Sequence, residues 1–204
     1  MLIPGGLTTD AAWRPSLSIT EKPPSGEPNS PHAADSAYER RLMKAFLLAG
    51  GRGERLRPLT LTIPKCLAPI NGTPVLAVWL DLLEREGIDE VLLNVSHHVT
   101  QVQTFLRART RGPRVHLSIE NEPIGTAGSV RANRSLVDGD ESFWILYADN
   151  LTDVRLQPIR DLHARHDGVL TIGLFHAPNP RAAGIVTLDE TGRVVDFIEK
   201  LPDV

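Results

Sequence analysis

The sequence predicts an α/β fold with a mostly parallel, Rossmann-like sheet, helices on both faces of that sheet and a small antiparallel hairpin. From Met43 onward, short apolar runs alternate with amphipathic helical stretches, a pattern that produces βαβ units with parallel strands. Three polar loops, AGGRGER, ENEPIGTAG and ADN, each follow a predicted strand. Because open α/β sheets bind ligands beyond the carboxyl ends of their strands, we expect these loops to meet at one edge.

The first 42 residues differ in composition from the rest of the chain. The segment EKPPSGEPNSPHAADS is rich in proline, serine, glycine and charge, and offers almost nothing to bury. Such a segment cannot offset the entropy cost of ordering. We therefore expect a disordered N-terminal extension over residues 1–42 and a folded domain over residues 43–204. Met43 opens the apolar run MKAFLLAGG, and one hypothesis is that it is the true initiator.

Each expected element follows from its local pattern. MKAFLL is a short apolar run typical of a buried strand, and GTPVLAVWLDLLEREG has helical spacing. In that helix we expect Thr73 as the N-cap, Pro74 in the first turn and Gly87 at the end. The later elements are a strand IDEVLLNV, a helix from about Thr100 to Ala108, a strand VHLSI, a helix GTAGSVRANRSL, a strand SFWILYA, a helix PIRDLHARH opened by Pro158, a strand GVLTIGLF and a hairpin over GIVTLDETGRVVDFIEK.

Composition and charge exclude several classes of protein. The chain has 204 residues and a net charge of -3, whereas nucleic-acid-binding domains usually carry a basic excess. Its one cysteine, Cys66, excludes an internal disulfide and any multi-cysteine metal site. No apolar run approaches the roughly 20 residues that span a bilayer. The first residues lack a basic segment followed by an apolar one, so we expect no secretory signal. We expect a cytoplasmic protein without nucleic-acid or membrane partners.

The loop after the first strand concentrates glycine and positive charge. Its glycines can turn backbone amides toward an anion, because glycine tolerates positive φ and has no side chain in the way. The residues concerned are Gly50, Gly51 and Gly53 for the amides, and Arg52, Arg55, Arg57 and Lys65 for countercharge. The chain has no Gly-Lys pair, which excludes a P-loop, and Leu56 replaces the third glycine of a dinucleotide fingerprint. A polyphosphate site is therefore favoured, with a solvated glycine-rich turn as the alternative.

The segment from Leu48 to Pro69 resembles the signature of the sugar-1-phosphate nucleotidylyltransferases, LAGGxGxRLxPLTxxxPKxLxP, at every fixed position. The resemblance continues through EPIGTAG, ADN and FIEK, and so extends from Met43 to the end of the chain. It implies that a sugar phosphate oxygen attacks the α-phosphorus of a nucleoside triphosphate and that pyrophosphate leaves. It also implies that Arg55 contacts the leaving phosphates, that Lys65 bridges the reacting phosphates, and that Leu48, Ala49, Gly50, Gly51 and Gly53 bind the nucleotide.

The segment ENEPIGTAGS resembles the nucleotide-reading loop of the family, particularly that of mannose-1-phosphate guanylyltransferases and their heptose-phosphate relatives. It implies nucleotide binding by Glu120, Gly125 and Thr126, with Glu120 at the base. A carboxylate accepts the two adjacent donors of guanine well, whereas uracil and thymine each present one donor. We therefore favour GTP. Uridylyl transfer stays open, as does the interpretation of Glu120 and Glu122 as ordinary exposed carboxylates.

The resemblance also implies a metal site and a sugar site. Asp149 matches the aspartate that binds Mg²⁺, an ion usually held by few carboxylates together with phosphates and water. Gly184 matches the glycine that approaches the sugar, and Glu199 and Lys200 match the pair that binds its hydroxyls and phosphate. The alternative for that pair is a surface ion pair. Asp153 is more typical of a helix cap or a loop residue.

The resemblance also bears on whether the chain turns over substrate. Relatives continue beyond Val204, and their second metal-binding aspartate has no counterpart here. Hence the two hypotheses are an enzyme that transfers a nucleotidyl group with Mg²⁺, and a binding module without turnover; a homo-oligomer also stays open.

Cys66 is interpreted as a buried spacer rather than a nucleophile. His97 and His98 are adjacent and lack metal-ligand spacing, so we expect a loop after a strand.

Overall fold

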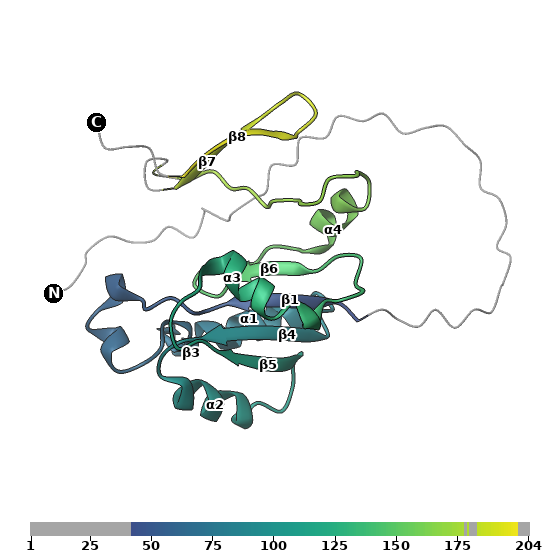
Figure 1. Cartoon of the computed structure of the whole chain (residues 1–204). Helices are drawn as coiled ribbons and strands as arrows, with labels where there is room; N and C mark the ends of the chain where they lie inside the picture. The colour runs from purple at the N-terminus through teal and green to yellow at the C-terminus, as the bar shows by residue number, and fades with distance from the viewer. Residues whose placement is uncertain (1–41, 178, 180–182, 200–204) are drawn as a thin grey trace, which may run out of the picture. The chain divides into compact units, whose positions relative to one another are not determined.

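The computed structural model describes residues 42–177, 179 and 183–199 (Figure 1). These residues divide after Arg160 into two units, and each is described by itself. Residues 1–41 of the expected extension lie outside the described residues, as do Lys200 and the four residues that follow it. The α-helix α4, Gln157–His163, contains the boundary between the units.

The first unit contains a four-stranded parallel sheet in the order β5-β4-β1-β6 (Figure 1). Its strands are β1 (Lys44–Leu48), β4 (Glu90–Val95), β5 (Arg114–Ile119) and β6 (Trp144–Tyr147). β1 pairs in parallel with both β4 and β6. The strand order therefore reverses beside β1, which is where this class of fold forms its ligand crevice. The predicted parallel α/β sheet is confirmed.

Helices cover both faces of this sheet, as predicted, because alternate residues of the buried strands point to opposite sides. Ala45 and Leu47 pack with α1 (Val75–Arg85) and α2 (Val99–Ala108) in one core cluster. Phe46 and Leu48 belong to a second cluster, where α3 (Gly125–Ala132) and the 3₁₀ turn η4 (Arg134–Leu136) supply the apolar contacts. The period-two pattern of β1 thus supports a core on each face.

A short hairpin precedes α1 and corrects the predicted cap. Strands β2 (Pro69–Ile70) and β3 (Thr73–Pro74) pair across a turn in which Asn71 has φ 49° and Gly72 has φ 80°. An Asn-Gly pair with both φ values positive favours such a tight hairpin. Thr73 pairs with Ile70, so the N-cap of α1 is Pro74 and not Thr73. At the other end, Gly87 has φ 76° directly after the helix, as expected for a C-terminal glycine.

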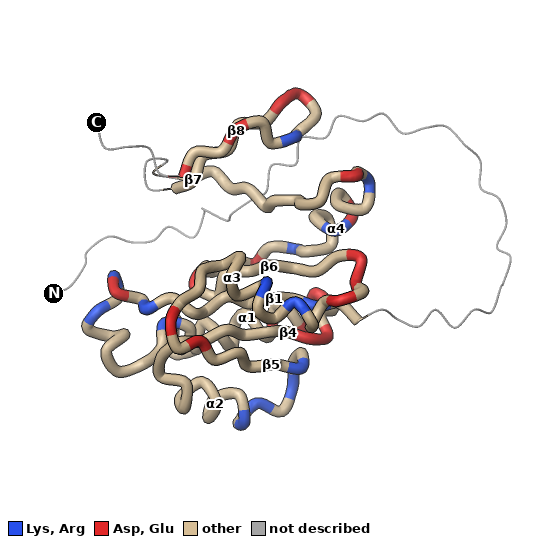
Figure 2. The backbone as a smooth tube through the Cα atoms, viewed as in Figure 1, with Lys and Arg blue, Asp and Glu red and all other residues tan. Residues whose placement is uncertain are grey.

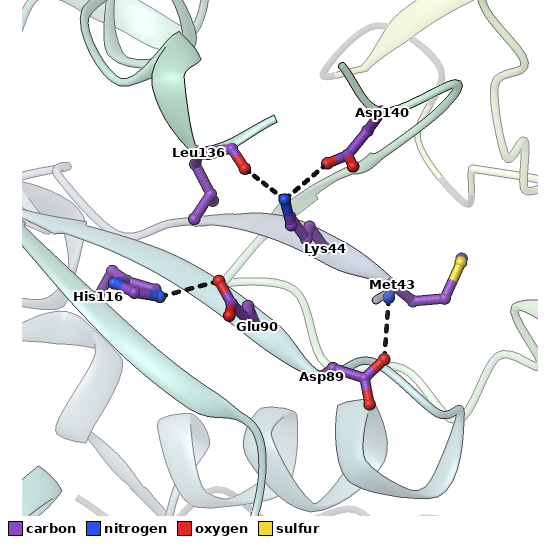
Figure 3. Close-up of polar contacts among 7 residues, drawn as sticks. All are labelled: Met43, Lys44, Asp89, Glu90, His116, Leu136 and Asp140. Atoms are coloured by element: carbon purple, nitrogen blue, oxygen red, sulfur yellow. Dashed lines mark hydrogen bonds and ion pairs between the residues drawn. The ribbon is translucent and has the colours of Figure 1, made fainter. Parts of the chain in front are cut away.

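Polar contacts secure the amino ends of the strands, opposite the edge where the predicted loops lie (Figure 3). Lys44 Nζ donates to the carbonyl of Leu136 at 2.8 Å and lies 3.0 Å from Asp140 Oδ2. The backbone N–H of Met43 donates to Asp89 at 2.9 Å. These contacts connect the amino end of β1 with segments on both sides. They do not involve its carboxyl end, where the glycine loop begins. That loop folds into three 3₁₀ turns, η1 (Glu54–Leu56), η2 (Leu59–Leu61) and η3 (Lys65–Leu67).

The second unit contains the predicted hairpin, formed by β7 (Gly184–Leu188) and β8 (Val194–Glu199) in antiparallel register. The predicted strand GVLTIGLF is wrong, because residues 168–175 form no regular element. This apolar run has no partner strand in the described part of the chain, and strand propensity without pairing does not produce a strand. Within the described residues, no helix is both long and apolar enough to cross a membrane.

Candidate active site

A cavity of about 260 Å³ opens at the carboxyl ends of the sheet strands in the first unit. The loops after β1, β5 and β6 all contribute to it, together with η3, so the three loops that the sequence predicts to meet do meet. The predicted residues that line it are Leu48, Ala49, Gly50, Gly51, Lys65, Glu120, Gly125, Thr126 and Asp149. These residues come from four separate parts of the chain, and together they line the same cavity.

Two glycines of the loop after β1 are required by close contacts. A Cβ on Gly50 would lie 2.8 Å from Asn94 Nδ2 and 3.4 Å from Glu120 Oε2. Gly53 has φ 63°, and a Cβ there would lie 2.9 Å from the side chain of Thr60 and 3.2 Å from Lys65. Any other residue at either position would displace a neighbour that lines or supports the cavity. Gly51 has open space around it.

Lys65 and Asp149 form an ion pair in the lining of the cavity. Lys65 Nζ lies 2.6 Å from Asp149 Oδ2, and both side chains are partly exposed, at 29% and 43%. The turn that carries Asp149 is held on both sides, since Ala148 N donates to Leu48 O at 2.9 Å and Trp79 Nε1 donates to Asn150 O at 2.8 Å. One cation and one carboxylate are therefore positioned together beside the glycine loop.

A buried polar network holds Glu120, and the sequence reasoning missed two of its members. Glu120 Oε1 accepts a hydrogen bond from Asn94 Nδ2 at 3.0 Å and another from Ser129 Oγ at 2.5 Å. Asn94 Oδ1 accepts from the backbone N–H of Ala49 at 2.7 Å. Asn94, Glu120 and Ser129 are each at least nine-tenths buried. Asn94 thus joins the loop after β5 to the glycine loop through direct hydrogen bonds.

A signal for Asn94 was present in the sequence. It interrupts the apolar run VLLNV on the face of β4 where Leu92 is buried. Buried polar groups are nearly always hydrogen-bonded, so an amide at a core position indicates a partner brought there by the fold. Ser129 gave a weaker signal, because serine within a helix is common.

Two predicted residues of the first unit do not line this cavity. Gly53 supports Lys65 without lining the cavity, and Arg55 is exposed on η1 and does not line it either. Nearby, Arg52 lies 3.4 Å from Glu122 across the loops. Figure 2 shows charges of both signs along the segment after β1 and a separate group of basic residues between α2 and β5. The role of Arg55 stays a prediction.

Cys66 lines the cavity beside Lys65 but is buried. Burial raises the pKa of the Cys66 thiol to about 11. A thiol with so high a pKa is almost entirely neutral near pH 7, and the thiolate is the nucleophilic form. The spacer interpretation is therefore favoured over a covalent role.

The predicted sugar residues lie in the second unit. Gly184 and Glu199 are paired opposite each other in the β7–β8 hairpin. A Cβ on Gly184 would lie 3.0 Å from the ring of Phe197, so the glycine lets that ring pack on the strand. Lys200 lies outside the described residues. The sugar-binding role of all three residues stays a prediction.

The donors at the cavity fit a hard cation held mainly by its substrates. No group of three or more potential metal-binding side chains occurs in the described ranges. Asp149 is partly exposed and beside a lysine, and a single carboxylate is what Mg²⁺ requires when phosphates and water supply its other ligands. The residues present therefore fit such an ion, and Asp149 is the side chain that could hold it.

Known proteins resemble this chain in sequence. Residues 44–203 match the family described as "Nucleotidyl transferase". The chain is 36% identical over 162 residues to the mannose-1-phosphate guanylyltransferase catalytic subunit beta of Danio rerio, and 36% identical over 163 residues to mannose-1-phosphate guanylyltransferase 1 of Arabidopsis thaliana. Each match covers 78% of this chain and 45% of the relative, so the chain spans about half the length of these curated relatives.

Solved structures share the fold. The crystal structure of HddC from Yersinia pseudotuberculosis superposes with a TM-score of 0.60 at 23% identity, covering 78% of this chain and 70% of that one. A second structure of the same protein, complexed with GMP-PN, gives the same values. At this identity the likeness establishes the fold, and the roles of individual residues must come from the cavity itself.

Proposed function

Because the chain belongs to the nucleotidyl transferase family, we propose that it transfers a nucleotidyl group from GTP to a sugar 1-phosphate of the mannose or manno-heptose type. The products are pyrophosphate and a nucleoside diphosphate sugar. The observation that carries this proposal is the placement of Lys65 and Asp149, 2.6 Å apart, beside the glycine loop in one cavity. Lysine and Mg²⁺ stabilise the charge on a transferring phosphoryl group, and a carboxylate can hold that ion.

The reaction is a direct displacement at the α-phosphorus. An oxygen of the sugar phosphate forms a bond to that phosphorus, and the bond to the bridging oxygen of pyrophosphate breaks. Negative charge increases on the transferring and leaving groups, so positioned countercharge stabilises the transition state. Lys65 supplies that charge from within the cavity, and Arg55 contacts the leaving phosphates from η1. Cys66, with its neutral thiol, takes no part in bond formation.

Members of the family generally use a divalent metal ion, and we assign Mg²⁺ to this chain. The ion would neutralise phosphate charge when bound. Asp149 would hold it, since that side chain is the carboxylate at the cavity wall nearest Lys65. Lys65 orients the carboxylate through their hydrogen bond and would add positive charge beside the phosphates.

Glu120 is assigned to the base. Both bonds from Asn94 and Ser129 go to Oε1, which leaves Oε2 for a ligand. Gly50 lies next to that oxygen, so the base can approach without a side chain between. The names of the relatives support guanine, since the Danio rerio and Arabidopsis thaliana proteins are both guanylyltransferases. Uridylyl transfer is the alternative within the same chemistry. Gly184, Glu199 and Lys200 are assigned to the sugar phosphate.

The test is pyrophosphate release by the 204-residue chain with Mg²⁺, each of GTP, UTP, dTTP, CTP and ATP, and a panel of sugar 1-phosphates. We expect release with GTP and a sugar of manno configuration. Release with UTP alone would replace the assignment of the base while keeping the transfer. A folded chain that binds nucleotide but releases no pyrophosphate with any pair would contradict the transfer and favour a binding module.

A further inference from the structure

The residues Ser96 and His97 directly follow β4, and the proposed reaction does not use them. They line a second, smaller cavity of about 10 Å³. Ala49, Gly51 and Lys65 line both this cavity and the larger one. The glycine loop therefore lies between the two, with the expected nucleotide on one side and the Ser-His pair on the other.

A chain of hydrogen bonds runs from His97 to the glycine loop. Ser96 Oγ lies 2.7 Å from the carbonyl oxygen of Gly50 and 2.5 Å from His97 Nδ1. A carbonyl oxygen only accepts, so the proton of the Ser96 hydroxyl goes to Gly50. The bond between His97 and Ser96 must then be donated by Nδ1–H, which fixes the tautomer of the ring. His97 Nε2 is buried and has no partner among the described residues.

These proton positions decide against a catalytic role for Ser96. A nucleophilic serine needs a neighbouring base that accepts its proton. Here His97 Nδ1 is the donor and the serine proton is already given to Gly50 O. The pair therefore acts on the backbone of the loop.

The peptide between Gly50 and Gly51 transmits this effect. The peptide is trans, and in a planar trans peptide the C=O and the following N–H point in opposite directions. A carbonyl held toward Ser96 directs the N–H of Gly51 away from Ser96. Gly51 also lines the larger cavity, whereas Ser96 lines only the smaller one, so we expect that direction to lead to the larger cavity. Glycine has no Cβ to resist peptide rotation, so an external hydrogen bond is needed to keep this orientation.

We propose that Ser96 and His97 are positioning residues that hold the Gly50–Gly51 peptide with its N–H toward the phosphates of the bound nucleoside triphosphate. This inference rests on the proposed function for the identity of the ligand. It explains why a Ser-His pair follows β4. The charges and glycines of the loop do not explain that pair by themselves.

The experiment compares the binding of GTP with that of guanosine, which has no phosphate, by titration calorimetry with Mg²⁺. Ser96→Ala removes the donor to Gly50, and we expect GTP affinity to fall about 5- to 10-fold, the worth of roughly one hydrogen bond. Guanosine affinity should stay the same, because Asn94, Ser129 and Glu120 are untouched. Ser96→Thr keeps the hydroxyl and should retain most of the GTP affinity.

Two variants of His97 form a matched pair. The amide nitrogen of asparagine is the same number of bonds from Cβ as Nδ1 of histidine, whereas that of glutamine matches Nε2. His97→Asn can therefore still donate to Ser96 and should bind GTP nearly as the parent does. His97→Gln loses that donor and should resemble Ser96→Ala. Thr104→Val is the control, because it removes a hydroxyl that donates to a backbone carbonyl inside α2, away from both cavities.

Unchanged GTP affinity in Ser96→Ala would overturn the inference, and so would an equal loss for GTP and guanosine, which would indicate a general disturbance. Equal losses in His97→Asn and His97→Gln would overturn the part assigned to Nδ1. Pyrophosphate release by the parent chain is measured separately. The proposed nucleotidyl transfer can therefore be contradicted while the positioning role of Ser96 and His97 is supported. The positioning role can likewise be contradicted while the transfer is supported.

Discussion

Contacts from several parts of the chain determine the position of Lys65. Its backbone belongs to η3, its stem packs against Gly53, and its ammonium group reaches Asp149 at 2.6 Å. Gly53 therefore has a purpose that the motif alone does not reveal, because a side chain there would push the lysine from the cavity. The charge of Lys65 is directed by contacts from two separate segments.

Replacement of Lys65 by glutamine should reduce kcat by about 100-fold or more, the loss typical of one preorganised electrostatic group. The check is the rate of pyrophosphate release at saturating substrate. Lys44→Gln is the matched control, since Lys44 is also a paired lysine but lies at the amino end of β1 (Figure 3). Equal losses in both variants would contradict a specific role for Lys65.

The two neighbouring glycines Gly50 and Gly51 should respond differently to alanine. In Gly50→Ala the new Cβ meets Asn94 Nδ2 at 2.8 Å, so the buried network must shift, and we expect a loss of about 1–3 kcal/mol in stability. In Gly51→Ala the Cβ meets nothing within 4 Å, and the change should stay within about 0.5 kcal/mol. Urea denaturation of both variants decides. A similar stability for both would contradict the close contact at Gly50.

Ionisation of the Cys66 thiol should lower the free energy of unfolding at alkaline pH. Burial raises its pKa from 9.0 to about 11 in the folded chain, so the folded state retains a proton that the unfolded state releases. The stabilisation is fully present below pH 9 and is lost as the pH rises toward 11. The two-unit difference corresponds to about 3 kcal/mol. We expect Cys66→Ala to show a smaller decrease in the free energy of unfolding between pH 8 and pH 11, and parallel profiles would disprove the assignment.

At the scale of elements, α1 positions a site residue that it does not carry. Trp79 is nearly fully buried in α1, yet its indole N–H donates to Asn150 O in the turn after β6. The same turn is joined to the end of β1 by the bond from Ala148 N to Leu48 O. A helix and a strand thus together determine where Asp149 lies. The packing of α1 on the sheet is therefore part of the site.

Trp79→Phe should weaken the metal-dependent step more than the fold. The ring still fills most of the core space, but Asn150 O loses its donor, and the turn with Asp149 gains freedom. We expect a loss of about 1–3 kcal/mol in stability and an increase in the Mg²⁺ concentration required for half-maximal rate. Trp144→Phe, on β6 and outside the cavity, is the control. An unchanged Mg²⁺ requirement would contradict this coupling.

At the scale of the whole molecule, the two units differ in how well their strands are covered. The strands β1 and β4 are almost wholly buried. Every residue of β8 is exposed, including Phe197 at 57%. A two-stranded hairpin by itself is marginally stable in water. The described chain therefore combines two buried central strands, β1 and β4, with a hairpin whose second strand is exposed along its whole length.

Hydrogen exchange should reveal this difference. Backbone amides of β1 and β4 should open only with global unfolding, whereas those of β7 and β8 should exchange through local opening. Mass spectrometry of peptic peptides from the native chain gives the comparison. Protection of β8 equal to that of β1 would show that the hairpin is stabilised by more than its own contacts.

Much of the fold was predictable because its signals are local. The period of apolar residues indicates strand or helix, an Asp-Glu-Thr-Gly turn indicates a hairpin, and the spacing of the glycine motif indicates a family. The strand GVLTIGLF was predicted wrongly, because its pattern is local whereas a strand needs a partner. The N-cap of α1 was misplaced by one residue, because pairing of Thr73 with Ile70 took precedence over the local preference for threonine as a cap.

The sequence by itself determined the α/β class, the family resemblance and the glycines and charged residues that follow the strands. Only the tertiary structure decided that Asn94 and Ser129 clamp Glu120, that Trp79 holds the turn of Asp149, and that Ser96 holds the peptide of Gly50. The physical reason is sequence separation. These contacts join residues between 9 and 71 positions apart, so they exist only after strand order and register have brought the segments together.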